Sequence, residues 1–162
     1  MRSIARIEPR LLQRAVTELL TEHRFTHFVT LTTHDPTLSN DGMRSRLKQW
    51  DAQVNRELVG PKWSRHKDEL TFFFAFLESP KVNPHWQLLL RVDDSPLTSK
   101  PTDILTLSTC FTSAWKRLSP AGTVDLQEIY RMADKKLVNY VGKQLGNMAQ
   151  YNAFVTPDEF RS

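Results

Sequence analysis

Two short stretches of this chain carry residue types that could cleave a phosphodiester bond. His85 and Gln87 lie two residues apart in an apolar run, and Tyr140 and Lys143 lie three residues apart in a helical pattern. A strand places residues i and i+2 on one face, and a helix places residues i and i+3 side by side. Two metal ligands on a strand, with a tyrosine and a cation on a helix, are the parts of a tyrosine-nucleophile reaction on phosphate.

The ligand types at the strand favour a hard divalent cation. An imidazole nitrogen, an amide oxygen and a carboxylate suit Mg²⁺ or Mn²⁺ better than a thiolate site would. Glu78 is the natural third ligand, because it ends the strand expected to pair with the strand of His85 and Gln87. Periodicity alone also allows a simpler alternative, in which His85 is a satisfied core histidine near a turn and Glu78 lies in solvent.

The length, net charge and cysteine count of the chain are those of an ordinary globular protein with one hydrophobic core. The chain has 162 residues, which predicts a single domain, residues 1–162. The net charge of +4 permits nucleic acid as a partner without requiring it. The single cysteine, Cys110, demands no oxidising compartment, and no apolar run is long enough for a membrane span, so we expect a cytoplasmic protein without membrane contact.

Hydrophobic periodicity predicts helices and strands in alternation. Asn40 or Asp41 is expected to cap the second helix. Strand 70–78 is apolar on both faces and should pair antiparallel with strand 85–92. The pattern predicts an α+β fold, with helices packed on a central, mainly antiparallel sheet of the ferredoxin or RRM type. We expect helices at 10–23, 40–58, 105–118 and 132–148, and strands at 27–33, 70–78, 85–92 and 123–130.

The last expected helix carries the tyrosine on the arc beside its apolar stripe. Tyr140, Lys143 and Lys136 lie within roughly 60° of one another at about 100° per residue. The simpler alternative is a core-edge tyrosine whose hydroxyl reaches water, flanked by a solvated lysine.

Three motifs, taken in order, resemble those of the HUH single-strand DNA endonucleases. Phe28-Val29-Thr30-Leu31-Thr32 resembles their first motif, His85-Trp86-Gln87 their metal motif, and Tyr140-Val141-Gly142-Lys143 their Tyr-x-x-Lys motif. The resemblance covers roughly residues 25–146 and is closest in spacing to rolling-circle replication initiators. Gln87 replaces the usual second histidine, a variant found among circovirus-like initiators. The resemblance divides the chain into an N-terminal helix (1–24), a catalytic core (25–148) and a tail (149–162).

The resemblance implies a specific reaction. A Mg²⁺ or Mn²⁺ ion held by Glu78, His85 and Gln87 would polarise the scissile phosphate of single-stranded DNA at an origin or hairpin. Tyr140 would attack phosphorus, giving a covalent 5′-phosphotyrosine that is later rejoined, and Lys143 would offset phosphate charge or assist the tyrosine. Gln144, four residues after the tyrosine, is the other candidate for third ligand, with Glu78 preferred.

A basic segment offers contacts for the DNA. Around 56–67 cations accompany a tryptophan, a pairing that single-strand binders use for stacking and for phosphate contact. The alternative is a solvated loop with the tryptophan folded onto the core. The candidate DNA contacts are Lys62, Trp63, Arg65, Lys67 and Lys136. No Gly-x-x-x-x-Gly-Lys-Ser/Thr loop is present, so unwinding would depend on a host helicase, with a host polymerase as a further partner.

Three rival functions remain open at this point. The first is a single-tyrosine transposase acting on transposon ends. The second is a catalytically inactive relative that only binds DNA hairpins, which the substitution at Gln87 motivates. The third is an unrelated α+β domain that binds RNA through its sheet, indifferent to divalent metal and to changes at His85.

Overall fold

The computed structural model describes most of the chain. The described residues are 9–66, 70–78, 82–92, 103–129, 139–140, 143 and 154–161. They form α-helices and a β-sheet, with short 3₁₀ helices (η). In chain order the elements are α1 (Pro9–His23), β1 (His27–Thr32), α2 (Asn40–Leu58), η1 (Trp63–Arg65), β2 (Phe72–Glu78), β3 (His85–Arg91), α3 (Ile104–Leu118), β4 (Thr123–Glu128), β5 (Phe154–Val155) and η4 (Pro157–Glu159).

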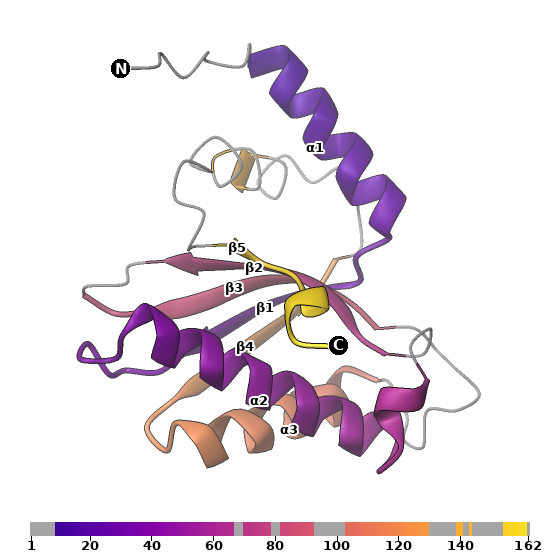
Figure 1. Ribbon diagram of the computed structural model, residues 1–162. Helices are drawn as coiled ribbons and strands as arrows, with labels where there is room; N and C mark the ends of the chain where they lie inside the picture. The colour runs from indigo at the N-terminus through magenta and orange to yellow at the C-terminus, as the bar shows by residue number, and fades with distance from the viewer. Residues whose placement is uncertain are drawn as a thin grey trace.

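The sheet confirms the predicted fold class. Its strand order is β4-β1-β3-β2-β5, and every neighbouring pair is antiparallel. The succession β1-α2-β2-β3-α3-β4 with this order is the ferredoxin-like arrangement. Helices α2 and α3 cover one face of the sheet, and α1 stands over the other (Figure 1). We call this second face, opposite α2 and α3, the outer face.

Strand alternation builds the core between the sheet and the α2–α3 layer. In β2 and β3 the residues that face the helices are fully or almost fully buried. Helices α2 and α3 pack apolar residues at helical spacing against them. The helix expected at 40–58 is confirmed as α2. The main residues of this core are Val29, Leu31, Met43, Leu47, Trp50, Val54, Phe73, Trp86, Leu88, Phe111 and Trp115.

Three fully buried tryptophans are satisfied by backbone carbonyls. The indole Nε1–H of Trp86 donates to the Met43 oxygen at 2.9 Å, and that of Trp50 donates to the Phe111 oxygen at 3.2 Å. Trp115 donates to the Thr32 oxygen at 2.8 Å. Buried indoles need such a partner, because an unpaired buried donor is costly. These bonds fix both helices against the strands that carry the site.

Gly122 is expected to tolerate no side chain. A Cβ built there would lie 2.7 Å from Trp115 Nε1, 2.8 Å from the Ser119 oxygen and 2.9 Å from the Thr32 oxygen. Two of these atoms belong to the backbone, so relief requires moving β1 or the end of α3. Gly122→Ala should therefore cost about 1–3 kcal/mol of unfolding free energy in urea titration. Ser113→Ala, on the exposed side of α3, is the control and should change it little.

The sequence pattern missed the C-terminal elements and one cap. Residues expected to be a tail form β5 and η4, with Val155 fully buried and β5 paired to β2 at Ala75 and Phe76. The α2 cap is Ser39, whose side chain accepts from the Gly42 amide at 3.0 Å, and not Asn40 or Asp41.

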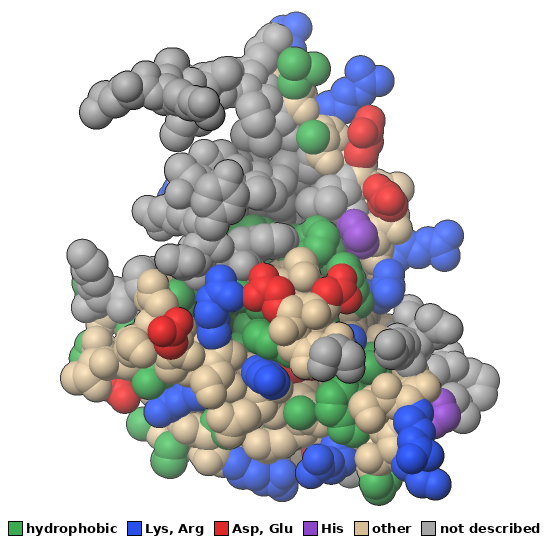
Figure 2. All heavy atoms as spheres, viewed as in Figure 1, with side chains coloured by type: hydrophobic (Ala, Val, Ile, Leu, Met, Phe, Trp, Pro, Cys, Tyr) green, Lys and Arg blue, Asp and Glu red, His purple; other side chains and the backbone are tan. Residues whose placement is uncertain are grey.

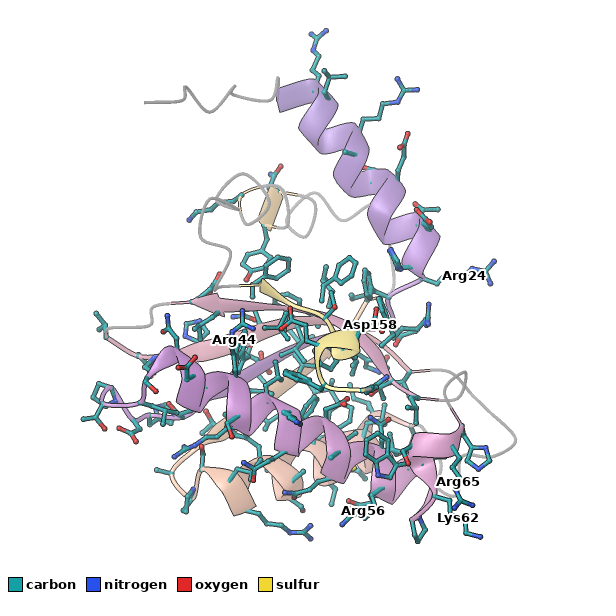
Figure 3. All side chains as sticks on the ribbon, viewed as in Figure 1. Arg24, Arg44, Arg56, Lys62, Arg65 and Asp158 are labelled. Atoms are coloured by element: carbon teal, nitrogen blue, oxygen red, sulfur yellow. The ribbon has the colours of Figure 1, made fainter. Side chains whose placement is uncertain are left out.

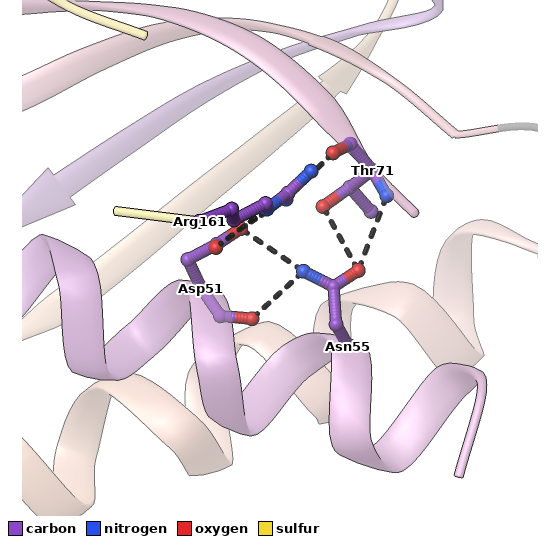
Figure 4. A network of polar contacts seen from close by, with 4 residues as sticks. All are labelled: Asp51, Asn55, Thr71 and Arg161. Carbon is purple, nitrogen blue, oxygen red and sulfur yellow. Dashed lines mark hydrogen bonds and ion pairs between the residues drawn. The ribbon is translucent and has the colours of Figure 1, made fainter. Parts of the chain in front are cut away.

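The C-terminal elements are held by a buried ion pair. Arg161 donates to both carboxylate oxygens of Asp51, at 2.6 and 3.1 Å, and to the Thr71 oxygen at 2.7 Å (Figure 4). Asn55 completes the network, donating to Asp51 and accepting from Thr71. Burial raises the pKa of Asp51, and the hydrogen bonds from Arg161 oppose that shift. This clamp ties the chain end to α2 and to the start of β2.

Other expectations agree where the structure describes them. Helix α1 and the strands begin and end within a few residues of the predicted limits. The helix expected at 132–148 lies mostly outside the described residues, within which Asn139, Tyr140 and Lys143 are helical. None of the described helices is long and apolar enough to cross a membrane.

Candidate functional site

The predicted site residues of β2 and β3 meet on the outer face of the sheet. The register places Glu78 directly opposite His85, and Gln87 opposite Phe76. On the other side of β3, Gln87 faces Thr30 of β1. The strand alternation inferred for His85 and Gln87 is therefore confirmed, and the register adds Glu78 as the cross-strand neighbour.

Glu78 and His85 form a hydrogen-bonded pair. His85 Nε2 lies 3.0 Å from Glu78 Oε2, and His85 Nδ1 lies 2.8 Å from the Asn83 oxygen. Both ring nitrogens thus face acceptors, an arrangement that suits the doubly protonated imidazolium. The Glu78 carboxylate raises the pKa of His85, and the hydrogen bond from His85 lowers the pKa of Glu78.

Tyr140 reaches the other oxygen of the same carboxylate. Its hydroxyl donates to Glu78 Oε1 at 2.7 Å, and its ring meets Phe28 edge-on with centroids 5.4 Å apart. Phe76 makes a second edge contact at 6.5 Å. Burial, together with the adjacent Glu78 carboxylate, raises the pKa of Tyr140 well above its ordinary value. The tyrosine is therefore a protonated donor in this arrangement, and Glu78 is the acceptor in line to receive its proton.

Sheet topology explains why a residue so late in the chain lies over the centre of the sheet. Strands β4 and β5 occupy opposite edges, and Tyr140 belongs to the connection between them. Four interstrand spacings of about 4.8 Å separate those edges. Helices α2 and α3 pack against the opposite face, and the Tyr140 contacts to Phe28, Phe76 and Glu78 place it on the outer face.

Gln87 is oriented by a residue that the sequence analysis did not single out. The Thr30 hydroxyl donates to Gln87 Oε1 at 2.8 Å. Phe28 and Phe76, which enclose the tyrosine ring, were also missed as site residues. Thr30 and Phe28 both belong to the strand motif noted in the sequence, so their shared face was visible from alternation. The contacts that Thr30 and Phe28 make with other strands and with Tyr140 could not be inferred from alternation, because they depend on how the strands are paired.

The donor set fits a small divalent cation. Two ligands about 2.1 Å from such an ion, at right angles, are about 3.0 Å apart, and the Glu78 and His85 donor atoms are 3.0 Å apart. A cation there would take the place of the proton on His85 Nε2. Among the described residues no group of three His, Cys, Asp or Glu side chains could hold a metal ion. Of the other predicted ligands, the described residues include the amide oxygen of Gln87, which shares the face of His85.

The remaining predicted residues lie apart from this centre or outside the described residues. Lys143 is exposed, and its charge contributes to lowering the pKa of Glu78. Lys62, Trp63 and Arg65 follow the end of α2 at the start of β2, so the length of β2, about 20 Å, separates them from Glu78. Figure 3 shows Lys62 and Arg65 on the side of the helices. Lys67, Lys136 and Gln144 lie outside the described residues.

The Glu78–His85 pair predicts a pH window for stability. Because the pKa of His85 is raised in the folded protein, His85 contributes stability that is complete below its ordinary pKa of 6.5. This stability disappears as pH rises through the raised pKa. Because the pKa of Glu78 is lowered in the folded protein, Glu78 contributes stability that is present above its ordinary pKa of 4.5. This stability is lost as pH falls through the lowered pKa. The unfolding free-energy difference between wild type and His85→Gln should therefore be largest between pH 4.5 and 6.5.

Urea titrations at about pH 5.5 and about pH 9 would check this difference. Burial also lowers the pKa of His27, but His27 is present in both proteins, so its effect cancels from the difference in unfolding free energy. In a Glu78→Gln background the same comparison should depend much less on pH, because the remaining influences on the pKa of His85, burial and the Asn83 carbonyl, oppose each other. A wild-type difference that is equally flat would show that the pair is not ionised in the folded state.

No protein-family model, curated protein or solved structure matches this chain.

Proposed function

We propose that the protein is a metal-dependent endonuclease that nicks and rejoins single-stranded DNA through Tyr140. The observation that carries the proposal is the double contact of one carboxylate: Glu78 bonds the Tyr140 hydroxyl through Oε1 and His85 through Oε2. The proposed nucleophile Tyr140 and the proposed cation ligand His85 thus both contact Glu78, the proposed proton acceptor and second ligand. The motif resemblance to HUH endonucleases supports the same reading.

In the proposed reaction the Tyr140 oxygen bonds to phosphorus while the bond from phosphorus to the 3′ oxygen breaks. The tyrosine proton passes to Glu78 Oε1, 2.7 Å away, and the departing 3′ oxygen takes a proton from water. The product is a 5′-phosphotyrosine and a free 3′-hydroxyl, and attack by that hydroxyl reverses the step. A Mg²⁺ or Mn²⁺ ion bound by His85, Glu78 and Gln87 would supply charge stabilisation at the phosphate.

The surrounding side chains hold the reacting groups in place. Phe28 and Phe76 contact the tyrosine ring edge-on beside the carboxylate. Lys143 places a cation near Glu78 that would offset the charge of the phosphate. Replication initiation for a plasmid or phage is the setting that we propose, and a single-tyrosine transposase would use the same chemistry on transposon ends.

The test is capture of the covalent intermediate. Protein is mixed with a labelled pool of single-stranded oligonucleotides and Mn²⁺, then denatured and run on a gel. We expect a protein–DNA adduct that requires the metal, maps to Tyr140 by mass spectrometry and is absent in Tyr140→Phe. DNA binding without any adduct, equal in wild type and Tyr140→Phe, would instead identify an inactive hairpin-binding relative. RNA binding that ignores metal and His85→Ala would identify the RNA-binding alternative.

A further inference from the structure

The helix layer on the face opposite the site carries a group of exposed cations. They come from α2, from the turn after it and from the end of α3, and among the described residues none of them forms a salt bridge. We call this group the basic stripe: Lys48, Arg56, Lys62, Arg65, Lys116 and Arg117.

Helical geometry directs these side chains away from the sheet. Arg56 is exposed, roughly opposite the buried side of α2, and Lys116 stands likewise on α3. The two helices run antiparallel, because Trp50 bonds the Phe111 oxygen at mid-helix and Arg46, near the start of α2, bonds Ser119 after the end of α3.

The antiparallel packing draws the charges into one band. Lys48 and the end of α3 lie at a similar level along the layer, and Arg56 lies eight residues, about 12 Å, further on. Lys62 and Arg65 continue the band past the end of α2. Figure 2 shows Lys and Arg side chains gathered along the lower side of the molecule, over this layer, and Figure 3 places Arg56, Lys62 and Arg65 together at the end of α2.

Few carboxylates offset this charge. The described residues of the layer contribute Asp41 at the start of α2, Glu57, Asp103 and the buried Asp51. Asp103 is engaged by the Thr106 amide and hydroxyl as the cap of α3, and Asp51 is paired with Arg161. The layer therefore presents a positive surface that is separate from the site.

A single strand in the site would have to bend round an edge of the domain to reach the stripe. The site lies on the outer face of the sheet, whereas the stripe lies beyond a helix layer about 10 Å thick. No aromatic side chain is among the exposed large hydrophobic residues of the described chain, and Trp63, the one tryptophan beside the stripe, is partly buried. Single-strand binders stack successive bases on several aromatic side chains.

We propose that the basic stripe binds the phosphate backbone of double-stranded DNA on the face opposite the site, joined to the strand that Tyr140 would cleave by single-stranded DNA that passes round an edge of the domain. Duplex DNA carries one charge per about 1.7 Å of axis over both strands, so a length equal to the 12 Å between Lys48 and Arg56 carries on the order of seven phosphate charges, part of which face the stripe. The contacts are to phosphates, which fixes register without reading sequence. The duplex would be a hairpin stem or the flank of an origin, and this assignment rests on the proposed function.

The test compares two DNA probes and two matched variants. One probe is a hairpin stem with a single-stranded tail, and the other is the tail alone. The stripe variant combines Lys48→Ala, Arg56→Ala and Lys116→Ala, and the control combines Arg10→Ala, Arg14→Ala and Arg24→Ala on and after α1, with the same change in net charge. All six side chains are exposed, so the melting temperatures of both variants should equal that of wild type.

We expect the stripe variant to bind the stem probe at least about tenfold more weakly in fluorescence anisotropy. Its slope of log affinity against log salt should fall by about two to three, or about 0.9 per lost phosphate contact. The control variant should bind the stem probe as wild type does, and binding and adduct formation on the tail alone should be unchanged in the stripe variant.

Equal loss of affinity in both triple variants would overturn the assignment, because net charge alone would then explain it. Unchanged stem binding in the stripe variant would overturn it as well, as would stripe-dependent binding to vesicles of anionic lipid with none to the stem. Anisotropy does not depend on cleavage. A protein that forms no adduct yet shows the stripe effect would therefore refute the proposed reaction and retain the duplex surface.

Discussion

Replacing Glu78 with alanine is expected to slow single-strand cleavage by at least about a hundredfold. The carboxylate holds the Tyr140 hydroxyl at 2.7 Å and His85 Nε2 at 3.0 Å, so its loss frees both groups together. It would also remove the proposed acceptor for the tyrosine proton and the proposed charged ligand of the cation. Single-turnover adduct formation with Mn²⁺, measured at saturating DNA, would record the loss as a change in rate and not in DNA affinity.

Two further variants sharpen this result. Glu78→Gln retains the shape and a hydrogen-bond acceptor for Tyr140 but removes the charge, so it separates positioning from charge. Glu22→Gln, on exposed α1, is the control and should cleave as wild type does. Cleavage by Glu78→Ala at the wild-type rate would mean that neither the proton transfer nor the cation uses this carboxylate.

The largest effect on stability is expected from Arg161→Ala. Asp51 is buried, with only 2% of its side chain exposed, and Arg161 donates to both of its oxygens. Removing the arginine leaves the buried carboxylate without a cation, with a hydrogen bond from Asn55, and takes a donor from the Thr71 oxygen. Breaking such a pair costs about 3–5 kcal/mol, a large share of the stability of a typical domain. Chemical denaturation at neutral pH would measure it.

A surface pair of the same C-terminal elements provides the matched control. Arg44 and Glu159 are 2.8 Å apart but substantially exposed, so Arg44→Ala should cost no more than about 1 kcal/mol. The double variant Asp51→Leu/Arg161→Met should be more stable than Arg161→Ala, because it leaves no buried charge without a partner. Equal losses in Arg44→Ala and Arg161→Ala would show that burial does not set the strength of the clamp.

Hydrophobic periodicity predicted the order of the helices and strands and the face to which each side chain points. It did not predict which side chains contact one another. The alternation of β3 was enough to place His85 and Gln87 on one face, because side-chain direction is a local property. Glu78 of β2 shares that face through the register that pairs it with His85. The pairing of Thr30 with Gln87 depends on register, which the alternation of a single strand leaves open. Tyr140 meets Glu78 across 62 positions of sequence, so only the topology brings them together.

The C-terminal elements escaped prediction for a related reason. Strand β5 has two residues, too few to show any period, and its partner strand lies far back in the chain. The Asp51–Arg161 pair spans 110 positions and joins two residue types that are usually solvated. A sequence pattern reports what each segment prefers alone, and these contacts exist only between segments.

The hydroxyl of Thr30 has a consequence for the choice of cation. A histidine ring presents nitrogen whichever way it turns, whereas an amide presents oxygen at one end and a hydrogen-bond donor at the other. The Thr30 hydroxyl donates to Gln87 Oε1 at 2.8 Å and so fixes which end is the oxygen, leaving that atom a second lone pair. A residue of β1 that bonds no cation itself would therefore favour oxygen-seeking Mg²⁺ or Mn²⁺ over nitrogen- and sulfur-seeking zinc.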